Sequence, residues 1–557
     1  MKNFLAIIPA RGGSKGIRRK NLRILKYKPL IWYVIDTAKN SKHVTDIVVT
    51  TDDKDIADYV EKLGVKVRKR PKHLAADDVP LDPVIYDAYK WYSEKFGEVD
   101  YVVTLQPTSP LLSSKTLDAA FKYMTENGLD TVLSVVDDTH LMWKEENGKI
   151  VPAYEKRLNR QWLTKVYKEA GAFLITKSSF VTETSRFGKK ISVYEVPFKE
   201  AVDVDTPVDW LMAEIFLSTV KILIVPSGNA LVGLGHIYRT VTLADNFLGN
   251  EITFFLVDSN ERAKEIIRQY GFKMRCGELK DVFEYSEAVD IVINDILDTE
   301  EWYINTLRKQ GKFVVNFEDL GVGAQKAHIV FNALYERLEA PKNHRYGYKY
   351  VVLNEKFLIE LPNEFSDEVK NVLVTFGGVD QNNLTLKTIR ALEYVCTRNK
   401  IRLKVILGPA YAYTEKLEEY LKAKGSKIEV LKSVKNMASE MRAMDLAITS
   451  NGRTVYELAA MRVPMVSIAQ NDRETLHTFA RYNEGVEYLG IACNVTEDMI
   501  KDTVEKVIED KEKRCRMHKA LPYEELRRGA WRVKKEILEY YRRWREGEDK
   551  DREESSG

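Results

Sequence analysis

The sequence lacks the features that mark several common classes of protein. No apolar run approaches the roughly 18 residues of a membrane-spanning helix, and the N-terminus has no charged-then-apolar signal pattern. The four cysteines lie far apart, without CxxC or zinc-ligand spacing, so neither a disulfide framework nor a structural metal is expected. A net charge of +3 on 557 residues gives no field for nucleic acid. We therefore expect a soluble, cytoplasmic protein with no nucleic-acid or membrane partner.

Short apolar runs alternate with longer amphipathic stretches along most of the chain. This alternation indicates an α/β protein with mostly parallel sheets covered by helices. It begins at FLAIIPA (4–10), starts afresh at KILIVPSG (221–228), and starts a third time at NVLVTFGG (371–378). The chain is too long for one ordinary domain. The predicted parts are a domain at 1–217, two Rossmann-like halves at 220–355 and 365–515, a C-terminal helix at 516–545, and a charged, disordered tail at 546–557.

A glycine-rich loop follows the first predicted strand. The segment IPARGGSKGIRRKN (8–21) gathers cations, Arg11 and Lys15 among them, around three glycines. Glycines let backbone N–H groups approach phosphate oxygens closely, and the cations neutralise the phosphate charge. The spacing is not that of a Walker A loop. A solvated basic turn is the alternative interpretation.

A pair of aspartates stands two residues apart near the end of the first domain. On a strand, Asp203 and Asp205 of VDVDT would point to the same face. Two carboxylates there suit Mg²⁺, which takes few protein ligands and bridges substrate phosphates. By itself, such a pair is more often not a metal site.

The first domain resembles the CMP-sialic acid synthetases, the cytidylyltransferases that activate nonulosonic acids. After the glycine-rich loop, the similarity continues in the family's order through VVTTDD, RPKHLAADD, LQPTSPLL and VDVDTPVDW. One departure is Arg18, where that family often has proline. The resemblance implies that the anomeric hydroxyl of a nonulosonic acid attacks the α-phosphate of CTP and that pyrophosphate leaves. It also implies a Mg²⁺ cofactor and a homodimer formed through this domain.

The family's functional positions are carried over individually. Those implied for CTP are Arg11, Gly13, Ser14, Lys15, Lys20, Asn21, Arg70 and Gln106. Those implied for the acceptor sugar are Gln106, Arg160 and Gln161, with Arg157 as a further candidate that could equally be a solvated basic residue. Those implied for the metal are Asp203 and Asp205.

His236 is the most informative residue of the second half of the chain. It follows GLG at a predicted strand-to-helix turn, where a helix N-terminus favours anions. A neutral imidazole there could act as a base. A lone histidine is more often structural. Complementary loops come later in the chain, with Gly377 and Gly378 after one strand and TSNGRTVYELAA (449–460) after another.

These loops together resemble the hydrolase of the pseudaminic acid pathway that acts on UDP-2,4-diacetamido-2,4,6-trideoxy-β-L-altropyranose. The motifs are GLGHIYRTVTLA, INDILDT, NFEDLG, FGGVDQNNLT, SNGRTVYEL and SIAQNDRETLHTFA, covering about 220–490. The resemblance implies a GT-B fold without a cofactor, in which His236 activates water to displace UDP. Two stretches depart from the family, Asn471-Asp472 and Asn294-Asp295-Ile296. The implied UDP-sugar positions are Gly235, Arg239, Gly377, Gly378, Asn451, Thr454 and Glu457.

The sequence thus predicts a nucleotidyltransferase domain with a GT-A-like mixed sheet, followed by a GT-B-type pair of Rossmann-like domains. The predicted function is bifunctional: activation of a pseudaminic-type nonulosonic acid with CTP, and hydrolysis of a UDP-2,4-diacetamido-2,4,6-trideoxyhexose to free sugar. The predicted partners are the small molecules CTP, nonulosonic acid and UDP-sugar. Two alternatives remain for the second half, namely a GT-B glycosyltransferase and a non-catalytic module that binds sugar nucleotides.

Overall fold

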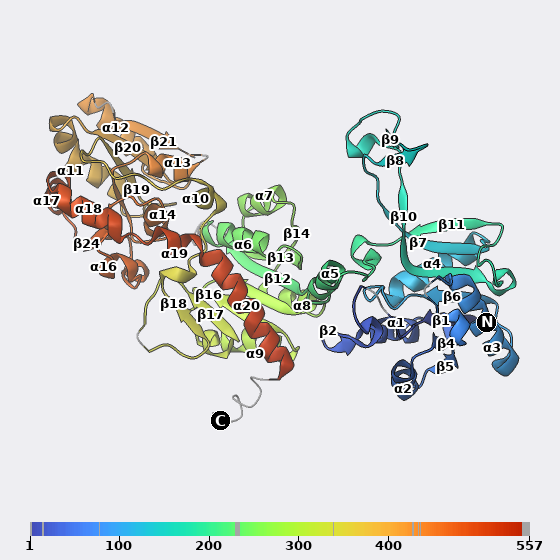
Figure 1. Ribbon diagram of the computed structural model, residues 1–557. Helices are drawn as coiled ribbons and strands as arrows, with labels where there is room; N and C mark the ends of the chain where they lie inside the picture. Colours follow the sequence, from blue (N-terminus) through green and yellow to red (C-terminus); the bar gives the residue numbers. More distant parts are fainter. Residues whose placement is uncertain are drawn as a thin grey trace. The chain divides into compact units, whose positions relative to one another are not determined.

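The computed structural model describes residues 3–13, 16–76, 78–228, 234–337, 339–425, 428–432, 434 and 436–547. The chain divides into two compact units, Met1–Thr219 and Val220–Gly557 (Figure 1). Of the predicted disordered tail, residues 548–557 lie outside the described residues. Among the helices that are described, none is both long enough and apolar enough to span a membrane.

The first unit is built on one mixed sheet with helices packed on it. In order across the sheet, its strands are β11 (Ile191–Glu195), β7 (Thr131–Asp137), β10 (Tyr167–Lys177), β6 (Tyr101–Leu105), β1 (Phe4–Pro9), β4 (Val44–Thr51) and β5 (Lys66–Lys69). Only β10 runs antiparallel to its neighbours in this sheet. The helices are α1 (Leu30–Lys39), α2 (Lys54–Lys62), α3 (Leu81–Phe96), α4 (Ser114–Glu126) and α5 (Pro207–Leu217).

Two small hairpins complete this unit. They are formed by β2 (Ile24–Leu25) with β3 (Lys28–Pro29), and by β8 (Trp143–Glu146) with β9 (Lys149–Pro152). The last helix, α5, begins with a capping box between Thr206 and Asp209 and has a proline at its first position. Both features satisfy or remove N–H groups that a helix start leaves unpaired, so the boundary is specified locally.

The second unit contains two fully parallel sheets. The first has the order β14 (Lys273–Gly277), β13 (Glu251–Ser259), β12 (Lys221–Gly228), β15 (Ile291–Asp295), β16 (Phe313–Phe317), β17 (Ile329–Asn332) and β18 (His344–Tyr346). The second has the order β21 (Glu429–Lys432), β20 (Arg402–Leu407), β19 (Asn371–Thr375), β22 (Leu446–Ser450), β23 (Met465–Ala469) and β24 (Val486–Ile491).

Both parallel sheets follow the Rossmann strand order and have a switch point, where the order of strands reverses. It lies between β12 and β15 in the first sheet and between β19 and β22 in the second. Ligands of open α/β sheets bind outside the carboxyl ends of the strands at this point. The predicted fold class is confirmed, with a mixed-sheet domain followed by a GT-B-type pair of Rossmann-like domains.

Helices surround both parallel sheets. Those of the first half and its exit are α6 (Gly235–Asn246), α7 (Glu261–Gln269), α8 (Val282–Ser286), α9 (Glu301–Lys309) and α10 (Glu355–Ile359). Those of the second half are α11 (Leu384–Arg398), α12 (Thr414–Lys424), α13 (Met437–Arg442), α14 (Thr454–Ala460), α15 (Asp472–Thr475), α16 (Phe479–Tyr482) and α17 (Glu497–Glu509). The C-terminal helices are α18 (Lys511–Ala520), α19 (Tyr523–Arg527) and α20 (Gly529–Glu546).

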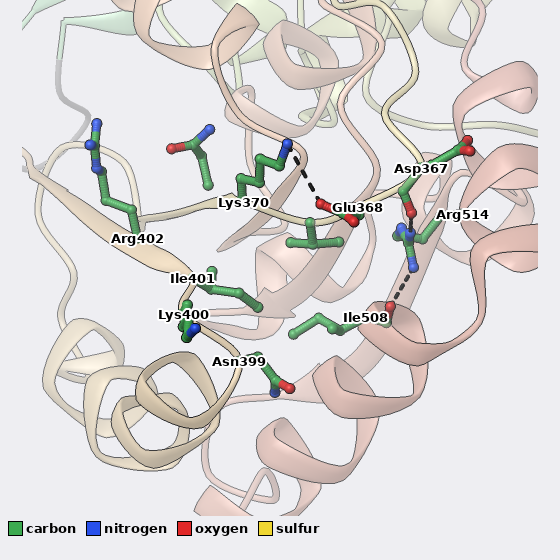
Figure 2. A pocket seen from close by; sticks show the side chains of 11 residues that line it. Asp367, Glu368, Lys370, Asn399, Lys400, Ile401, Arg402, Ile508 and Arg514 are labelled. Carbon is green, nitrogen blue, oxygen red and sulfur yellow. Dashed lines mark hydrogen bonds and ion pairs between the residues drawn. The ribbon is translucent and has the colours of Figure 1, made fainter.

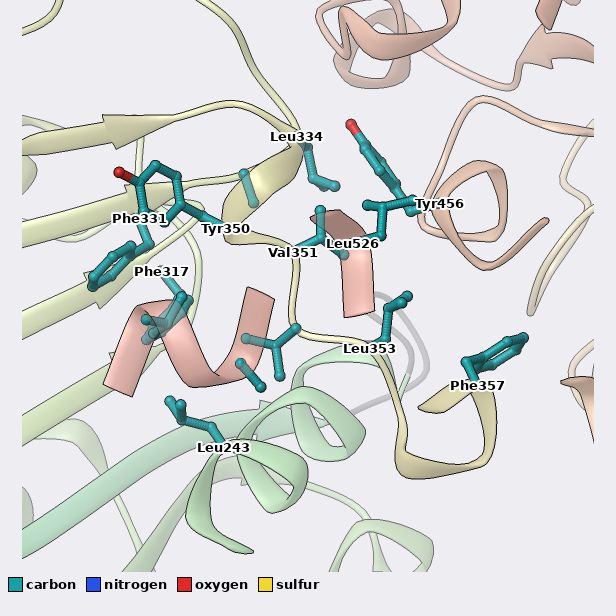
Figure 3. Close-up of a cluster of buried hydrophobic side chains, with 14 of the residues drawn as sticks. Leu243, Phe317, Phe331, Leu334, Tyr350, Val351, Leu353, Phe357, Tyr456 and Leu526 are labelled. Atoms are coloured by element: carbon teal, nitrogen blue, oxygen red, sulfur yellow. The ribbon is translucent and has the colours of Figure 1, made fainter. Parts of the chain in front are cut away.

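One hydrophobic cluster joins the two halves of the second unit. Figure 3 shows Leu243 from α6, Phe331 from β17, Tyr456 from α14 and Leu526 from α19 packed around the connecting segment 350–357. Removing this much apolar surface from water favours one arrangement of the halves. The halves therefore share a core and are described together.

The C-terminal segment is not the single helix that the sequence predicted. Helix α18 ends at Ala520, two residues before Pro522, because a proline disfavours helical backbone in the residue that precedes it. Helix α20 then packs against the first half, where Glu536 accepts hydrogen bonds from Arg345 Nε at 2.6 Å and Tyr350 OH at 2.9 Å. The chain thus crosses back over both halves.

We expect Gly529→Ala to destabilise the second unit. A Cβ on this residue would overlap the carbonyl oxygen of Val351, so α20 or the connecting segment must move, at about 1–3 kcal/mol. Unfolding in urea would measure this loss, with Lys535→Ala on the exposed side of α20 as the control. Helix propensity alone predicts the opposite sign, so a stabilised Gly529→Ala protein would contradict this close approach.

Candidate functional sites

The predicted CTP-binding residues follow three of the four parallel strands β6, β1, β4 and β5, which are consecutive in the sheet of the first unit. Arg11 comes just after β1, Arg70 directly after β5, and Gln106 directly after β6. Because these strands are parallel, their carboxyl ends meet at one edge of the sheet. Ser14 and Lys15, which were predicted to bind CTP, lie outside the described residues.

The glycine-rich loop is held against the aspartate pair. Asn21 Nδ2 donates to the carbonyl oxygen of Arg11 at 2.9 Å, which closes the loop on itself. Lys20 Nζ donates to the carbonyl oxygen of Val204 at 2.9 Å and to Asp205 Oδ1 at 2.7 Å. Three predicted CTP residues and one predicted metal ligand are therefore linked through the adjacent residues Lys20 and Asn21.

Asp203 and Asp205 lie on an extended segment, not on the strand that the sequence analysis assumed. The residues between and before them, Val202 and Val204, are buried, so both carboxylates share the exposed side. The Asp203 residue is exposed, but its carboxyl is partly enclosed by protein; this desolvation and the negative charge of Asp205 raise the pKa of Asp203, although a hydrogen bond with Thr108 opposes this. Two neighbouring carboxylates are a suitable donor set for a divalent cation.

Gly171 brings Gln106 and Asp203 together. A Cβ on Gly171 would lie 3.3 Å from Gln106 Nε2 and 3.6 Å from Asp203 Oδ2, so both side chains converge on this glycine. Its φ of 67° also favours glycine. This position in YKEAGAF links the predicted sugar residue to the predicted metal site, and the sequence analysis did not single it out.

Arg70 is buried beside a second cation. Its Nη2 donates to the carbonyl oxygen of Thr50 at 2.8 Å. Burial lowers the pKa of Arg70, and the nearby positive charge of Arg11 lowers it further, while Asp52 raises it. Like charges held close together favour an anion between them, as a triphosphate would supply.

The predicted acceptor-sugar residues are less closely tied to this site. Arg157, Arg160 and Gln161 are all exposed, on the segment between β9 and β10. A short 3-10 helix begins at Arg160, and no helix includes Arg157. Their side chains are therefore not fixed by packing.

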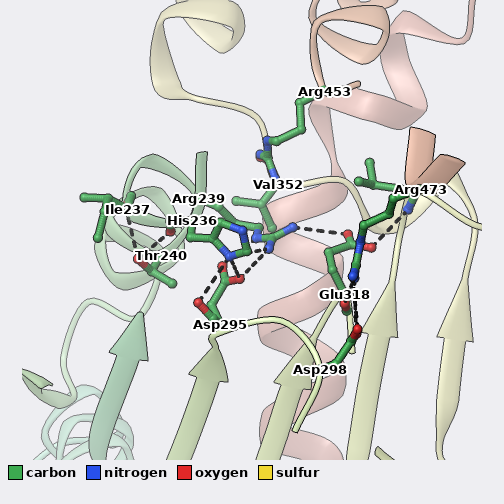
Figure 4. Close-up of polar contacts among 11 residues, drawn as sticks. His236, Ile237, Arg239, Thr240, Asp295, Asp298, Glu318, Val352, Arg453 and Arg473 are labelled. Atoms are coloured by element: carbon green, nitrogen blue, oxygen red, sulfur yellow. Dashed lines mark hydrogen bonds and ion pairs between the residues drawn. The ribbon is translucent and has the colours of Figure 1, made fainter. Parts of the chain in front are cut away.

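In the second unit, His236 forms a buried pair with an aspartate that the sequence analysis did not identify as its partner. Nδ1 of His236 lies 2.5 Å from Oδ1 of Asp295 (Figure 4). His236 is in the first turn of α6, after β12, and Asp295 ends β15, the neighbouring strand across the switch point. The sequence did carry one signal for this partner, because the apolar segment DIVIND ends in an acidic residue where a buried strand would end.

Arg239 completes this cluster. Its Nε donates to Asp295 Oδ2 at 2.6 Å, and its Nη1 donates to Glu318 Oε1 at 3.2 Å. Burial by itself would raise the pKa of Asp295, but the charges of Arg239 and His236 lower it well below the usual range. Asp295 is therefore ionised. Because both acids accept hydrogen bonds from Arg239, this arginine stabilises the cluster and does not form an open phosphate-binding site.

The cluster fixes the orientation of the imidazole. An ionised aspartate can only accept, so Nδ1 of His236 carries a proton, and Nε2 is the ring nitrogen that has a lone pair when the imidazole is neutral. This is how an acid orients a general base. Glu318 has a φ of 51°, which is strained for a residue with a side chain and is held by its buried setting.

The remaining predicted UDP-sugar positions line the switch point of the second parallel sheet. Gly377 and Gly378 come soon after β19, and Asn451 and Thr454 follow β22 beside it. Burial raises the pKa of Glu457, although the charge of Arg453 opposes this. The predicted residues thus gather at two switch points of one unit.

Glu474 ties two of these loops together and was missed by sequence. Its Oε2 accepts from the backbone N–H groups of Gln470 at 2.8 Å and Asn451 at 3.2 Å. Burial raises the pKa of Glu474 to about 7. Next to it, Arg473 forms an ion pair of 3.1 Å with Asp298 of the first half, which bridges the halves (Figure 4).

A separate hollow lies at the opposite edge of the second parallel sheet. It is formed at the amino ends of β19 and β20 and has a volume of about 860 Å³ (Figure 2). Its wall includes Lys370, Arg402 and the buried Arg514, and none of the predicted site residues lines it.

Comparison with known proteins finds a family, sequence relatives and similar solved structures. Residues 5–200 match the family described as Cytidylyltransferase. A pseudaminic acid cytidylyltransferase of Campylobacter jejuni is 33% identical over 223 residues, which are 39% of this chain and 96% of that enzyme. An uncharacterised protein of Methanocaldococcus jannaschii is 34% identical over 274 residues, which are 45% of this chain and 56% of that protein.

This chain spans little more than half of the length of the M. jannaschii protein. Among solved structures, the crystal structure of Acinetobacter baumannii MurG covers 57% of this chain and 99% of its own, with 11% identity and a TM-score of 0.44.

We expect Glu474→Gln to stabilise the second unit more at high pH than at low pH. The folded pKa of about 7 exceeds the ordinary glutamate value, so wild-type stability falls as the pH rises from about 4.5 through 7. The neutral glutamine avoids this loss, and the difference in unfolding free energy should reach at most about 3 kcal/mol by pH 8. Urea unfolding at pH 5 and pH 8 measures it, with exposed Glu484→Gln as control. An equal difference in unfolding free energy between the two proteins at both pH values would contradict the raised pKa of Glu474.

Proposed function

Because this chain belongs to the cytidylyltransferase family, we propose that its first unit transfers the CMP group of CTP to a nonulosonic acid of the pseudaminic type. The observation that carries the proposal is the convergence of the glycine-rich loop, Arg70, Gln106 and the aspartate pair at one edge of the sheet. Cations there would hold the triphosphate, while Gln106 would lie between nucleotide and sugar.

The proposed reaction needs positioning and neutralisation of charge. The anomeric oxygen of the acid bonds to the α-phosphorus of CTP, and the bond from that phosphorus to the pyrophosphate oxygen breaks. Arg11 and Arg70 would draw the phosphates together and stabilise the charge that passes to pyrophosphate. Asp203 and Asp205 would hold Mg²⁺, which supplies further charge neutralisation when bound.

We expect Asp203→Asn to abolish most Mg²⁺-dependent activity without loss of stability. The substitution removes one metal ligand, so pyrophosphate release from CTP should fall at least about 100-fold. Since burial and Asp205 already disfavour the Asp203 carboxylate, the folded state should not suffer. The assay offers pseudaminic, legionaminic and N-acetylneuraminic acids separately, with Glu126→Gln on α4 as control. Undiminished release at limiting Mg²⁺ would rule out this ligand.

For the second unit we propose hydrolysis of a UDP-2,4-diacetamido-2,4,6-trideoxyhexose. Nε2 of His236 would take a proton from water, the water oxygen would bond to the anomeric carbon, and the bond from that carbon to the UDP oxygen would break. The observation that supports a catalytic role is the buried, oriented pair of His236 and Asp295, because a module that only binds needs no such base. A glycosyltransferase would use the same base on an acceptor hydroxyl.

We expect His236→Asn to lower the rate of sugar release by about 10²–10⁴-fold, the usual contribution of a general base. The same protein should keep its CTP-dependent activity, which belongs to the other unit. The assay follows free hexose from the UDP-sugar without any acceptor, and Tyr238→Phe on the same helix is the control. Full activity of the His236→Asn protein would contradict the assignment of His236 as the general base. Turnover of the wild type only when an acceptor is present would favour the glycosyltransferase.

The homodimer through the first unit stays a prediction. Exposed apolar side chains on and beside the β8–β9 hairpin, including Trp143, Ile150 and Trp162, give a surface that a second copy could cover.

A further inference from the structure

We propose that Arg453 binds the diphosphate of the sugar nucleotide in the second unit, directly beside the His236 base. This inference rests on the proposed hydrolase function and names a residue that the resemblance did not supply. Arg453 comes after β22, at the switch point of the second parallel sheet, and immediately precedes α14.

The side chain of Arg453 crosses from the second half to the start of α6. A Cβ on Gly235 would lie 3.3 Å from Cδ of Arg453, so the two residues are in contact. Gly235 is the residue before His236. Figure 4 shows Arg453 reaching toward His236 and Arg239 from the opposite half. A cation from one half is thereby placed next to a base from the other.

Few of the hydrogen-bond donors of Arg453 have a described partner. A guanidinium has five N–H donors, yet the single hydrogen bond described for this side chain runs from Nη2 to the carbonyl oxygen of Val352 at 2.8 Å. Burial and the nearby charge of Arg239 together lower the pKa of Arg453 to about 10, although Glu457, Asp295 and Glu318 oppose this. A partly buried cation that bonds to one neutral carbonyl has donors left for an anion.

The acids near Arg453 do not neutralise it by direct contact. Asp295 and Glu318 both attract it, but the hydrogen bonds described for their carboxylates come from Arg239, from His236 and from a backbone N–H. Glu457 on α14 also attracts it, with its own pKa raised by burial. These acids therefore attract Arg453 without forming a described hydrogen bond to its guanidinium.

The chemistry of the leaving group identifies the ligand. In a UDP-sugar the β-phosphate is bonded to the anomeric carbon, and that carbon must stand near Nε2 of His236 for water to attack it. When the bond breaks, its electron pair stays on the β-phosphate oxygen, and charge grows there. The planar fork of Arg453 suits two phosphate oxygens, whereas Arg239 is committed to Asp295 and Glu318.

The test is calorimetric titration of the full chain with UDP and with uridine. We expect Arg453→Gln to weaken UDP binding by about 10- to 100-fold, the usual worth of hydrogen bonds to a charged group, and to leave uridine binding unchanged. Sugar release should slow as well. Arg442→Gln is the matched control, because Arg442 lies in the same half and pairs with Glu360 at 3.0 Å.

Arg453→Lys keeps the charge but loses the fork, so it should bind UDP with intermediate affinity. It also keeps the inference testable if the glutamine protein does not fold, since uridine binding by the lysine protein reports a folded unit. Equal UDP affinity in the wild-type and lysine proteins, or in the wild-type and glutamine proteins, would overturn the inference alone. Failure of the wild type to bind UDP would instead overturn the proposed hydrolase function.

Discussion

The second unit depends on a buried cluster of charges at the junction of two strands. His236, Arg239, Asp295 and Glu318 are all nearly inaccessible to water. Charges can be buried only when they are paired and hydrogen-bonded, so each member requires the others. The Rossmann order makes this possible because β12, which precedes α6 and His236, pairs directly with β15, which ends at Asp295. The same constraint holds α6 in place and orients the imidazole.

The proposed sites of the two units are built from charged groups in different ways. The first unit places cations and two exposed aspartates beside a glycine-rich loop, the groups that we propose hold a triphosphate and a metal. The second unit encloses its acids and one arginine, leaving Nε2 of His236 and the guanidinium of Arg453 as the groups with unused capacity. One arrangement neutralises charge, and the other orients a base.

The shared core of the second unit gives the halves a fixed relation near this cluster. Tyr456 from one half and Leu243 from the other belong to the same hydrophobic cluster, and helix α20 packs back onto the first half through Glu536. The contact between Arg453 and Gly235 depends on that relation, since each residue belongs to a different sheet. The packing of the shared core therefore sets the position of Arg453 relative to His236.

The sequence by itself determined the α/β class, the three starts of the strand–helix alternation and the loops that follow the strands. These follow from local patterns, in which apolar runs form strands and glycine-rich or polar segments end them. The partner of His236, the bridging role of Glu474 and the reach of Arg453 were decided only by the tertiary structure. Each joins residues of different strands or halves, and no local pattern specifies which strand ends meet or how deeply a charge is buried.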